Sequence, residues 1–438
     1  MSAATVDLVL MGIILAAFVG GMQRGIAAII VIRPLCDRLF EQARFDVLGE
    51  ALSYGAVLNF IVIAAMLLSL QRIQGKTRTS LERAWIPFLA VTFIAVLYSP
   101  VQVDAFRKFL TYVSYMAMFV LPLAIVRTQA SAIYFSKAVI LSSILPVLFG
   151  LFQMGSGIDW YQGTRIASTF THPNIFAFYI LTTVAVILCL LASDHVTLSR
   201  QLRTTLGLYL VPLLVLLVMT KTRSAWAGCV VLFLIYGAIK DRRVLVASLI
   251  LPIVAFAVPP IRDRLMALTA GNDYVGWVQT VNPYAWRQIL WEKAFPMILD
   301  RPWFGYGLYS FPYYSPSFFP LESSRGVDAH NVYVQLAFET GCAGLLAYLW
   351  IFCRNLLLLG RYWAFDRRGL TMVAAMICVY LMVGYSDNLL EYVSYGWCFW
   401  FTLGLVAVHL AHHRPVAAAP RRRTIEQPPE GIAHAQRA

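Results

Sequence analysis

The chain is organised as long apolar windows separated by short polar loops. Windows long enough to cross a bilayer as helices fall at 51–69, 84–99, 107–126, 133–154, 174–192, 205–220, 224–239, 243–259, 331–353, 370–386 and 392–411. Before them, residues 5–33 predict either a hairpin of two short helices around "GGMQRG" or one interrupted span. The pattern predicts an all-α polytopic membrane protein with about 12 transmembrane helices (12 or 13 by this count).

Composition narrows the class further. Of 438 residues, 60% are hydrophobic and only 13% are charged, which excludes a soluble globular protein. The net charge of +13 is scattered between apolar spans, so it indicates cytoplasmic-loop bias and argues against a nucleic-acid partner. The seven cysteines lie mostly in apolar runs and predict no redox or metal role.

The basic loops predict the orientation. "RIQGKTRTSLER", "VRTQASAIYFSK", "SRQLR", "KDRR" and "RYWAFDRRG" alternate along the chain and form one set with the C-terminal tail. The positive-inside rule places this set in the cytoplasm and the other loops in the periplasm of a bacterium. We therefore expect a multi-pass protein of the inner membrane with a cytoplasmic C-terminus, in contact with membrane lipids.

Four regions are expected. Residues 1–259 form an N-terminal transmembrane bundle, 260–330 a large periplasmic loop domain, 331–411 the C-terminal transmembrane helices, and 412–438 a disordered cytoplasmic tail rich in Ala, Pro and Arg.

Topology reduces the candidate bases to two histidines, because only His172 and His330 fall on the periplasmic side. His330 begins the helix of "DAHNVYVQLAFETGCAG", where it either meets a substrate or caps its own helix; these two interpretations stay open. Glu339 points about half a turn away and lies deeper, so we expect a structural carboxylate that needs a partner on another helix. Gly341 and Gly344 would let a neighbouring helix approach closely.

Basic residues give a second signal on the periplasmic side. "TKTRSAWAG" places Lys221 and Arg223 in a short turn against the positive-inside bias, so the turn needs an anion. A lipid-linked diphosphate suits the planar guanidinium; ordinary contact with lipid headgroups is the alternative. Further on, residues 286–299 have helical spacing and carry Arg287, and Asp300-Arg301-Pro302 ends that helix. The aromatic run that follows either stacks on sugar rings or forms an interfacial belt.

Nucleotide and metal motifs are missing from the sequence, which has no Walker loop, Rossmann fingerprint or HExxH. An activated donor at the periplasmic face would have to arrive on lipid. Arginines could neutralise a diphosphate leaving group, and a histidine could serve as the base for an acceptor hydroxyl.

Four stretches, in order, resemble the O-antigen ligase and polymerase superfamily. "HNVYVQLAFETGCAG" is similar to its His-Asn/Ser … Glu-x-Gly-x-x-Gly signature, "TFTHPN" to its "G-T-F-x-x-P-N", "KTRSAWAG" to its Thr-Arg-Ser turn, and "WRQILWEKAFPMILDRPWFGYG" to its arginine helix ending in "P-x-x-G-x-G". The resemblance covers most of the chain from about residue 84. One departure is the serine of "STFTHPN", where many members have glycine.

The resemblance implies a metal-independent glycosyltransferase without a cofactor, whose donor is an undecaprenyl-diphosphate-linked glycan. Arg223 and Arg287 would hold the diphosphate and His330 would act on the acceptor hydroxyl. Secondary contacts with the substrate would come from Lys221, Arg165 and Arg301. His172 and Asn174 of the matched "HPN" are further substrate-binding candidates, for which a structural role is favoured over catalysis.

The identity of the acceptor stays open, because the family contains two activities that share these motifs. A polymerase extends a lipid-linked repeat unit of O-antigen or exopolysaccharide, and a ligase transfers the polymer to lipid A–core; we favour the polymerase, because such enzymes occur in several pathways per genome. Other polysaccharide assembly proteins are expected partners. A transporter of lipid-linked oligosaccharides would instead require mid-membrane charges and an inverted repeat, neither of which is clear in the sequence. A purely structural membrane protein would leave the basic turn unexplained.

Overall fold

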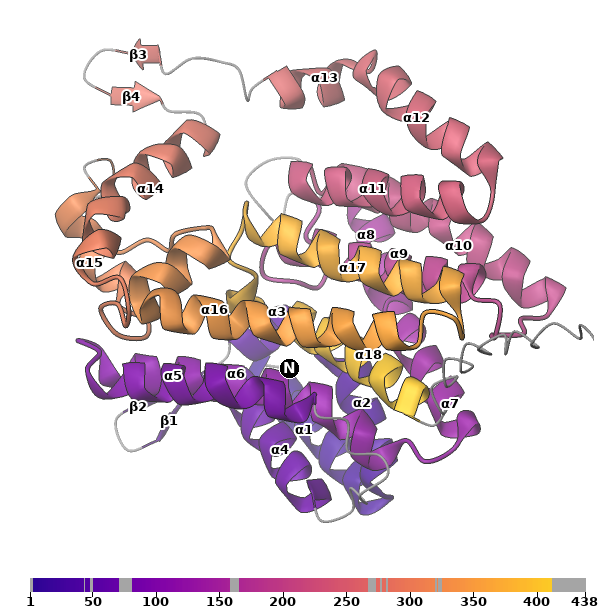
Figure 1. The fold of residues 1–438 in the computed structure, drawn as a ribbon, viewed down its shortest axis with the longest axis horizontal. Helices are drawn as coiled ribbons and strands as arrows, with labels where there is room; N and C mark the ends of the chain where they lie inside the picture. Colours follow the sequence, from indigo (N-terminus) through magenta and orange to yellow (C-terminus); the bar gives the residue numbers. More distant parts are fainter. Residues whose placement is uncertain are drawn as a thin grey trace, which may run out of the picture.

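The computed structural model describes residues 3–42, 44–47, 50–70, 81–157, 165–266, 273–275, 278–280, 283–319, 321 and 325–411. These residues are mostly helical (Figure 1). The α-helices are α1 (Ala3–Val19), α2 (Met22–Leu35), α3 (Asp37–Gln42), α4 (Tyr54–Leu70), α5 (Trp85–Leu97), α6 (Gln102–Ile125), α7 (Gln129–Leu141), α8 (Ile144–Ser156), α9 (Pro173–Ala192), α10 (Arg200–Met219), α11 (Arg223–Ile239), α12 (Arg242–Phe256), α13 (Pro259–Met266), α14 (Pro283–Asp300), α15 (Phe311–Phe318), α16 (Val332–Arg361), α17 (Arg367–Gly384) and α18 (Val393–Ala411). The remaining elements are the short 3-10 helices η1 (Glu82–Ala84) and η3 (Leu389–Glu391) and two antiparallel hairpins, β1 (Arg44–Val47) with β2 (Glu50–Ser53) and β3 (Asp273–Val275) with β4 (Val278–Thr280).

The predicted class is confirmed. Within the described residues, seven helical segments are long and apolar enough to cross a membrane, and three shorter apolar helices accompany them. One of the seven, Ala130–Ser156, consists of α7 and α8 in succession. Two more predicted windows form helices of 13 and 15 residues, α5 and α12. The chain is therefore an all-α multi-pass membrane protein. The number of about 12 spans and the four-region division stay predictions, and the tail 412–438 lies outside the described residues.

The N-terminal apolar run is a hairpin, one of the two forms that the sequence left open. The helices α1 and α2 pack against each other, with the Phe18 ring against Gly25. Gly21 turns the chain between them at φ 125°, in a region that side chains other than glycine rarely adopt.

The predicted span 133–154 is divided into α7 and α8 at Ser142 and Ser143. Pro146 lacks the N–H that would bond to the carbonyl of Ser142, so the ladder is interrupted there. The two serine hydroxyls lie within hydrogen-bond distance of Tyr179 on α9 and Tyr209 on α10, at 2.5 and 2.8 Å. The two serines at the break therefore connect α7 and α8 to α9 and α10.

The long helices run side by side, and α14, α15 and the hairpin β3–β4 lie beyond one end of them (Figure 1). The helix α9 is buried along almost its whole length, whereas α12 exposes most of its apolar side chains, including Ile253 at 73%. Such an apolar, outward surface is what a bilayer solvates. At the other end of the bundle, Asp194 accepts from Lys240 at 3.4 Å and from Arg368 at 2.9 Å, so three of the predicted alternating loops meet.

Candidate functional site

The bundle end that faces α14 contains a polar cavity of about 860 Å³. Its walls come from α3, β1, the loop before α9, the turn between α10 and α11, α13, α14, the segment before α16, and the connection between α17 and α18. Seven of the predicted site residues line it: Arg165, His172, Asn174, Lys221, Arg223, Arg287 and His330. The lining residues range from Asp37 to Val393, so segments that are far apart in the sequence are brought to one place.

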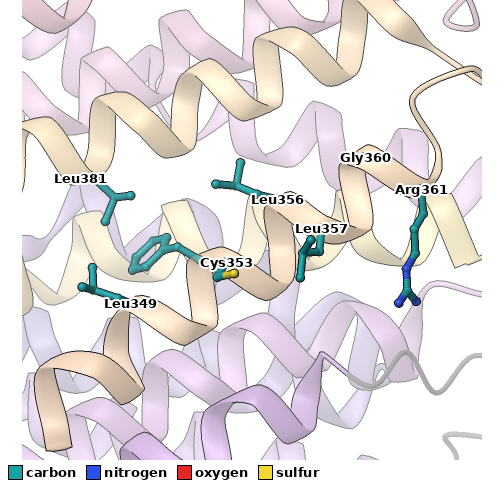
Figure 2. A pocket seen from close by; sticks show the side chains of 8 residues that line it. Leu349, Cys353, Leu356, Leu357, Gly360, Arg361 and Leu381 are labelled. Atoms are coloured by element: carbon teal, nitrogen blue, oxygen red, sulfur yellow. The ribbon is translucent and has the colours of Figure 1, made fainter.

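A second cavity lies on the side of α16 that faces α17, and it is of a different kind (Figure 2). Its lining is apolar apart from Arg361 at one end, and Leu349, Cys353 and Leu381 are typical members. None of the predicted site residues lies there, so the candidate site is the polar cavity.

His330 is held in place by its neighbours rather than by a helix that it caps. Its backbone has φ 48°, in the left-handed region, and the next residue, Asn331, is the cap of α16: its side-chain oxygen accepts from the N–H groups of Tyr333 and Val334 at 2.9 and 3.1 Å. The Trp286 ring contacts the imidazole edge-to-face with centroids 5.8 Å apart. The capping alternative is therefore excluded, and the His330 side chain, 39% exposed, is open to the cavity.

Asp387 is the carboxylate beside this histidine. Its Oδ1 lies 3.7 Å from His330 Nδ1 and accepts from the Tyr392 hydroxyl at 2.8 Å, and the side chain is only 2% exposed. Burial would raise the pKa of Asp387, but the nearby His330 and Arg287 outweigh it and lower that pKa to about 2. A permanently ionised carboxylate next to Nδ1 favours a proton on that nitrogen and leaves Nε2 as the acceptor.

Asn174 links this pair to the cationic side of the cavity. Its amide nitrogen donates to Asp387 Oδ2 at 2.5 Å, and its amide oxygen accepts from Arg165 at 2.7 Å and from the Thr222 hydroxyl at 3.1 Å. Arg165 also donates through Nε to the carbonyl of Thr220 at 2.9 Å. One amide therefore fixes the loop before α9, the turn after α10 and the segment after α17 relative to one another.

The predicted basic turn is present between α10 and α11. Lys221 has φ 54°, so the turn is tight, and both Lys221 and Arg223 line the cavity. Arg223 donates to the carbonyl of Arg264 on α13 at 3.2 Å, and Arg287 on α14 donates to the carbonyl of Ser386 at 2.7 Å. Each of these bonds uses one N–H group of the guanidinium, and its acceptor is a neutral carbonyl that does not neutralise the positive charge.

Charge is distributed unevenly over the cavity. Its carboxylates have positive partners behind the wall, since Glu41 pairs with Arg33 and Glu391 with Lys108. By contrast, Arg223, Arg264 and Arg287 form no salt bridge with any residue in the described part of the chain. Guanidinium groups that face a polar cavity without a direct salt bridge attract an anion with several oxygens.

The loop before α9 contains Ser168, the serine of "STFTHPN" at which the sequence departs from the family pattern. Ser168, which stands where many family members have glycine, has φ 53°. Its N–H donates to Gln153 at 3.0 Å and its hydroxyl donates to the carbonyl of Pro146 at 2.5 Å. These two bonds stabilise Ser168 in a left-handed conformation that glycine would adopt without strain.

Four of the residues singled out in the sequence lie outside the polar cavity: Arg301, Glu339, Gly341 and Gly344. Arg301 does not line the cavity; its side chain is 57% exposed and stacks on the Tyr306 ring, 4.5 Å from the centroid. Glu339 is buried, but its partners are Gln335 one turn earlier on the same helix and the N–H of Phe311 at 3.4 Å. One of these two partners therefore lies on another helix: it is the backbone at the start of α15.

The glycines of α16 also differ from expectation. Gly341 interrupts the helix with φ 64° and receives the turn 302–304: a Cβ there would lie 2.3 Å from the backbone of Trp303. A turn, and not a helix, makes the close approach, because the Cys342 N–H needs the carbonyl of Pro302 (2.7 Å) once the ladder is broken. At Gly344 the nearest atoms belong to Thr340 of the same helix.

Sequence reasoning missed Asp37, Glu41, Arg264, Asp387 and Glu391 in the cavity wall. A signal existed for two of them, since "YSDNLLEY" places carboxylates in a short loop on the same predicted side as the basic turn. Within the described residues, no group of three or more His, Cys, Asp or Glu side chains could hold a metal ion; the absence of a cofactor stays a prediction.

The fold and the cavity define a multi-pass helical membrane protein with a polar, cation-rich site at one end of its bundle. Residues 208–349, from within α10 to within α16, match the family model for O-antigen ligase. Over these residues, the match confirms the resemblance to the O-antigen ligase and polymerase superfamily. No curated protein matches the chain.

Proposed function

We propose that the protein is a membrane glycosyltransferase that moves a glycan from an undecaprenyl-diphosphate carrier to an acceptor sugar at the periplasmic face of the bacterial inner membrane. The observation that carries the proposal is the placement of Arg223, Arg264 and Arg287, which form no salt bridge with the described residues, in the same cavity as His330 and Asp387. The match to the O-antigen ligase family supports lipid-linked sugars as the substrate class.

In the proposed reaction, the arginines hold the two phosphates of the donor. The acceptor hydroxyl gives its proton to Nε2 of His330 while its oxygen forms the new bond to the anomeric carbon. The bond between that carbon and the diphosphate oxygen breaks, and the lipid diphosphate leaves with the electron pair. Asp387 orients the imidazole and stabilises its charged form, and the guanidinium groups stabilise the charge that develops on the leaving group.

The Arg165–Asn174 pair has a positioning role in this proposal. Asn174 contacts both Arg165 and Asp387, so the distance between the phosphate-binding side and the base is fixed by one amide. A rigid spacing favours reaction, because it holds the reacting groups in the required geometry before the bond forms.

The identity of the acceptor distinguishes a polymerase from a ligase, and we favour a polymerase of O-antigen or exopolysaccharide repeat units.

The test is to determine which glycan is carried on undecaprenyl diphosphate in a strain that lacks the protein. Accumulation of single repeat units on the outer leaflet supports the polymerase. Long polymers on the carrier identify a ligase that acts on lipid A–core. Repeat units confined to the cytoplasmic leaflet identify a transporter and contradict the proposal.

A further inference from the structure

His172 is the second imidazole of the cavity, and its tautomer is set by the fold. It is the N-cap of α9, and its Nδ1 accepts the N–H of Asn174 at 3.0 Å. A ring nitrogen that accepts a hydrogen bond carries no proton, so the single proton of the neutral ring is on Nε2. The same side chain lines the cavity.

The two cavity histidines therefore have opposite hydrogen-bonding character. His330 turns its Nδ1 towards the Asp387 carboxylate, 3.7 Å away, and its Nε2 is the accepting nitrogen. His172 turns its Nδ1 towards a backbone N–H, and its Nε2 is the donating nitrogen. A base and a neutral donor thus occupy one cavity, although both are the same residue type.

The surroundings keep His172 uncharged. Burial lowers its pKa, Asp387 acts in the opposite direction, and Arg165, His330 and Arg287 lower it further, to about 4. At neutral pH the ring cannot deliver a proton, but it can donate a hydrogen bond. Its contribution should therefore be constant between pH 6 and 8.

The position of His172 indicates which group of the substrate its Nε2–H would contact. Asn174, two residues later, holds the Arg165 guanidinium at 2.7 Å and the Thr222 hydroxyl of the basic turn at 3.1 Å. His172 therefore lies in the same segment as Arg165 and beside the residue that joins the cationic side of the cavity to Asp387. The acceptor hydroxyl, by contrast, has to reach His330. Donors beside cations are arranged for phosphate oxygens.

We propose that His172 donates its Nε2–H to a phosphate oxygen of the lipid diphosphate and so acts as a substrate-binding residue in addition to capping α9. This inference rests on the proposed function of the cavity. Because negative charge grows on the diphosphate as it leaves, a neutral donor there stabilises the transition state without competing for a proton.

Two substitutions separate the cap from the donor. In His172→Asn the amide oxygen lies where Nδ1 lies in histidine, and asparagine is a favoured N-cap, so the cap is kept and the distal donor is lost. In His172→Gln the amide group reaches the position of Nε2 and the short capping contact is lost. Each variant therefore removes one of the two roles.

The experiment uses the full-length protein in lipid nanodiscs. It measures binding of farnesyl diphosphate and farnesyl monophosphate, the rate of glycan transfer, and the thermal unfolding midpoint. We expect His172→Asn to unfold like the wild type but to bind the diphosphate about 10- to 100-fold more weakly at every pH from 6 to 8. His172→Gln should unfold at a lower temperature and bind more tightly than His172→Asn.

The opposite outcomes are distinguishable. If His172→Asn binds and transfers like the wild type, or if binding follows the unfolding temperature across both variants, His172 is only a helix cap and the inference is overturned. If the wild type itself binds neither diphosphate nor monophosphate, the proposed function of the cavity fails as well.

Discussion

The side-chain amide of Asn174 donates to Oδ2 of Asp387 at 2.5 Å and joins two loops that are 213 residues apart in the sequence. The bond places the carboxylate beside His330 at a fixed distance from Arg165, which the same amide holds at 2.7 Å. The catalytic geometry that we propose therefore depends on a residue that does not itself have to touch a substrate.

Asn174→Asp should disrupt this geometry more than Asn174→Ala. The aspartate would bring a second carboxylate against Asp387, which is buried, and like charges at this distance repel strongly in a low-dielectric site. We expect both variants to lose transfer, with a clearly lower unfolding temperature for the aspartate. The measurement is thermal unfolding in nanodiscs together with transfer rate; equal stability of the two variants would mean that Asp387 is not restrained by this bond.

His330→Ala should abolish transfer while donor binding is kept. Loss of a general base lowers rates by about 100- to 10,000-fold, and the phosphate-binding arginines remain. Asn331→Ala is the matched comparison, because it removes the cap of α16 and should cost about 1 kcal/mol of stability. Wild-type rates in His330→Ala, with correct insertion, would remove His330 from the mechanism.

Arg223→Ala and Arg287→Ala should each weaken binding of a polyprenyl diphosphate, because a charge-assisted hydrogen bond contributes about 1.5–3 kcal/mol. Arg301→Ala serves as the control: this arginine lies outside the cavity and is 57% exposed, so binding should stay at the wild-type level. The comparison is made by titration of farnesyl diphosphate. An equal loss in all three variants would indicate a general effect of net charge.

Asp328 should make stability depend on pH. Burial and the charge of Glu391 raise the pKa of Asp328 to about 7, well above the usual value of an aspartate, against the attraction of Lys108. The folded protein thus binds this proton more tightly than the unfolded chain, so the stabilisation is complete below about pH 4 and declines as the pH rises to about 7. Asp328→Asn should flatten the unfolding temperature over this window and unfold at a higher temperature than the wild type at pH 8. An unchanged profile in the variant would assign the dependence to another group.

Gly341→Ala should destabilise the protein strongly, because φ 64° is unfavourable for alanine and the new Cβ would meet the backbone of Trp303. Gly360→Ala, in the same helix, has open space around it and should be neutral or stabilising by up to about 1 kcal/mol. Thermal unfolding of the two variants checks this. Similar midpoints would show that the turn 302–304 does not depend on Gly341.

The class of protein, the spans and the candidate chemistry follow from the sequence, because each is a local property. Apolar windows of membrane length predict helices wherever they occur, and the basic turn "TKTRS" remains anomalous whatever its neighbours are. The break at Gly341 was not predicted, because it depends on a backbone contact with a distant turn. The division at Ser142 and Ser143 was not predicted either: Pro146 is a local signal for it, but the apolar window 133–154 continues across that proline.

Tertiary structure alone decided which residues share the cavity. The sequence identified His330, Arg223 and Arg287, but it also proposed Arg301 as a secondary contact, and it could not show that Asp387 lies 3.7 Å from His330. Which side chains meet depends on how helices pack, and a helix can rotate or shift without any change in its apolar pattern. The sequence by itself therefore determined a membrane protein with arginines and a histidine on one side, and packing decided that Asn174 and Asp387 hold them at fixed distances.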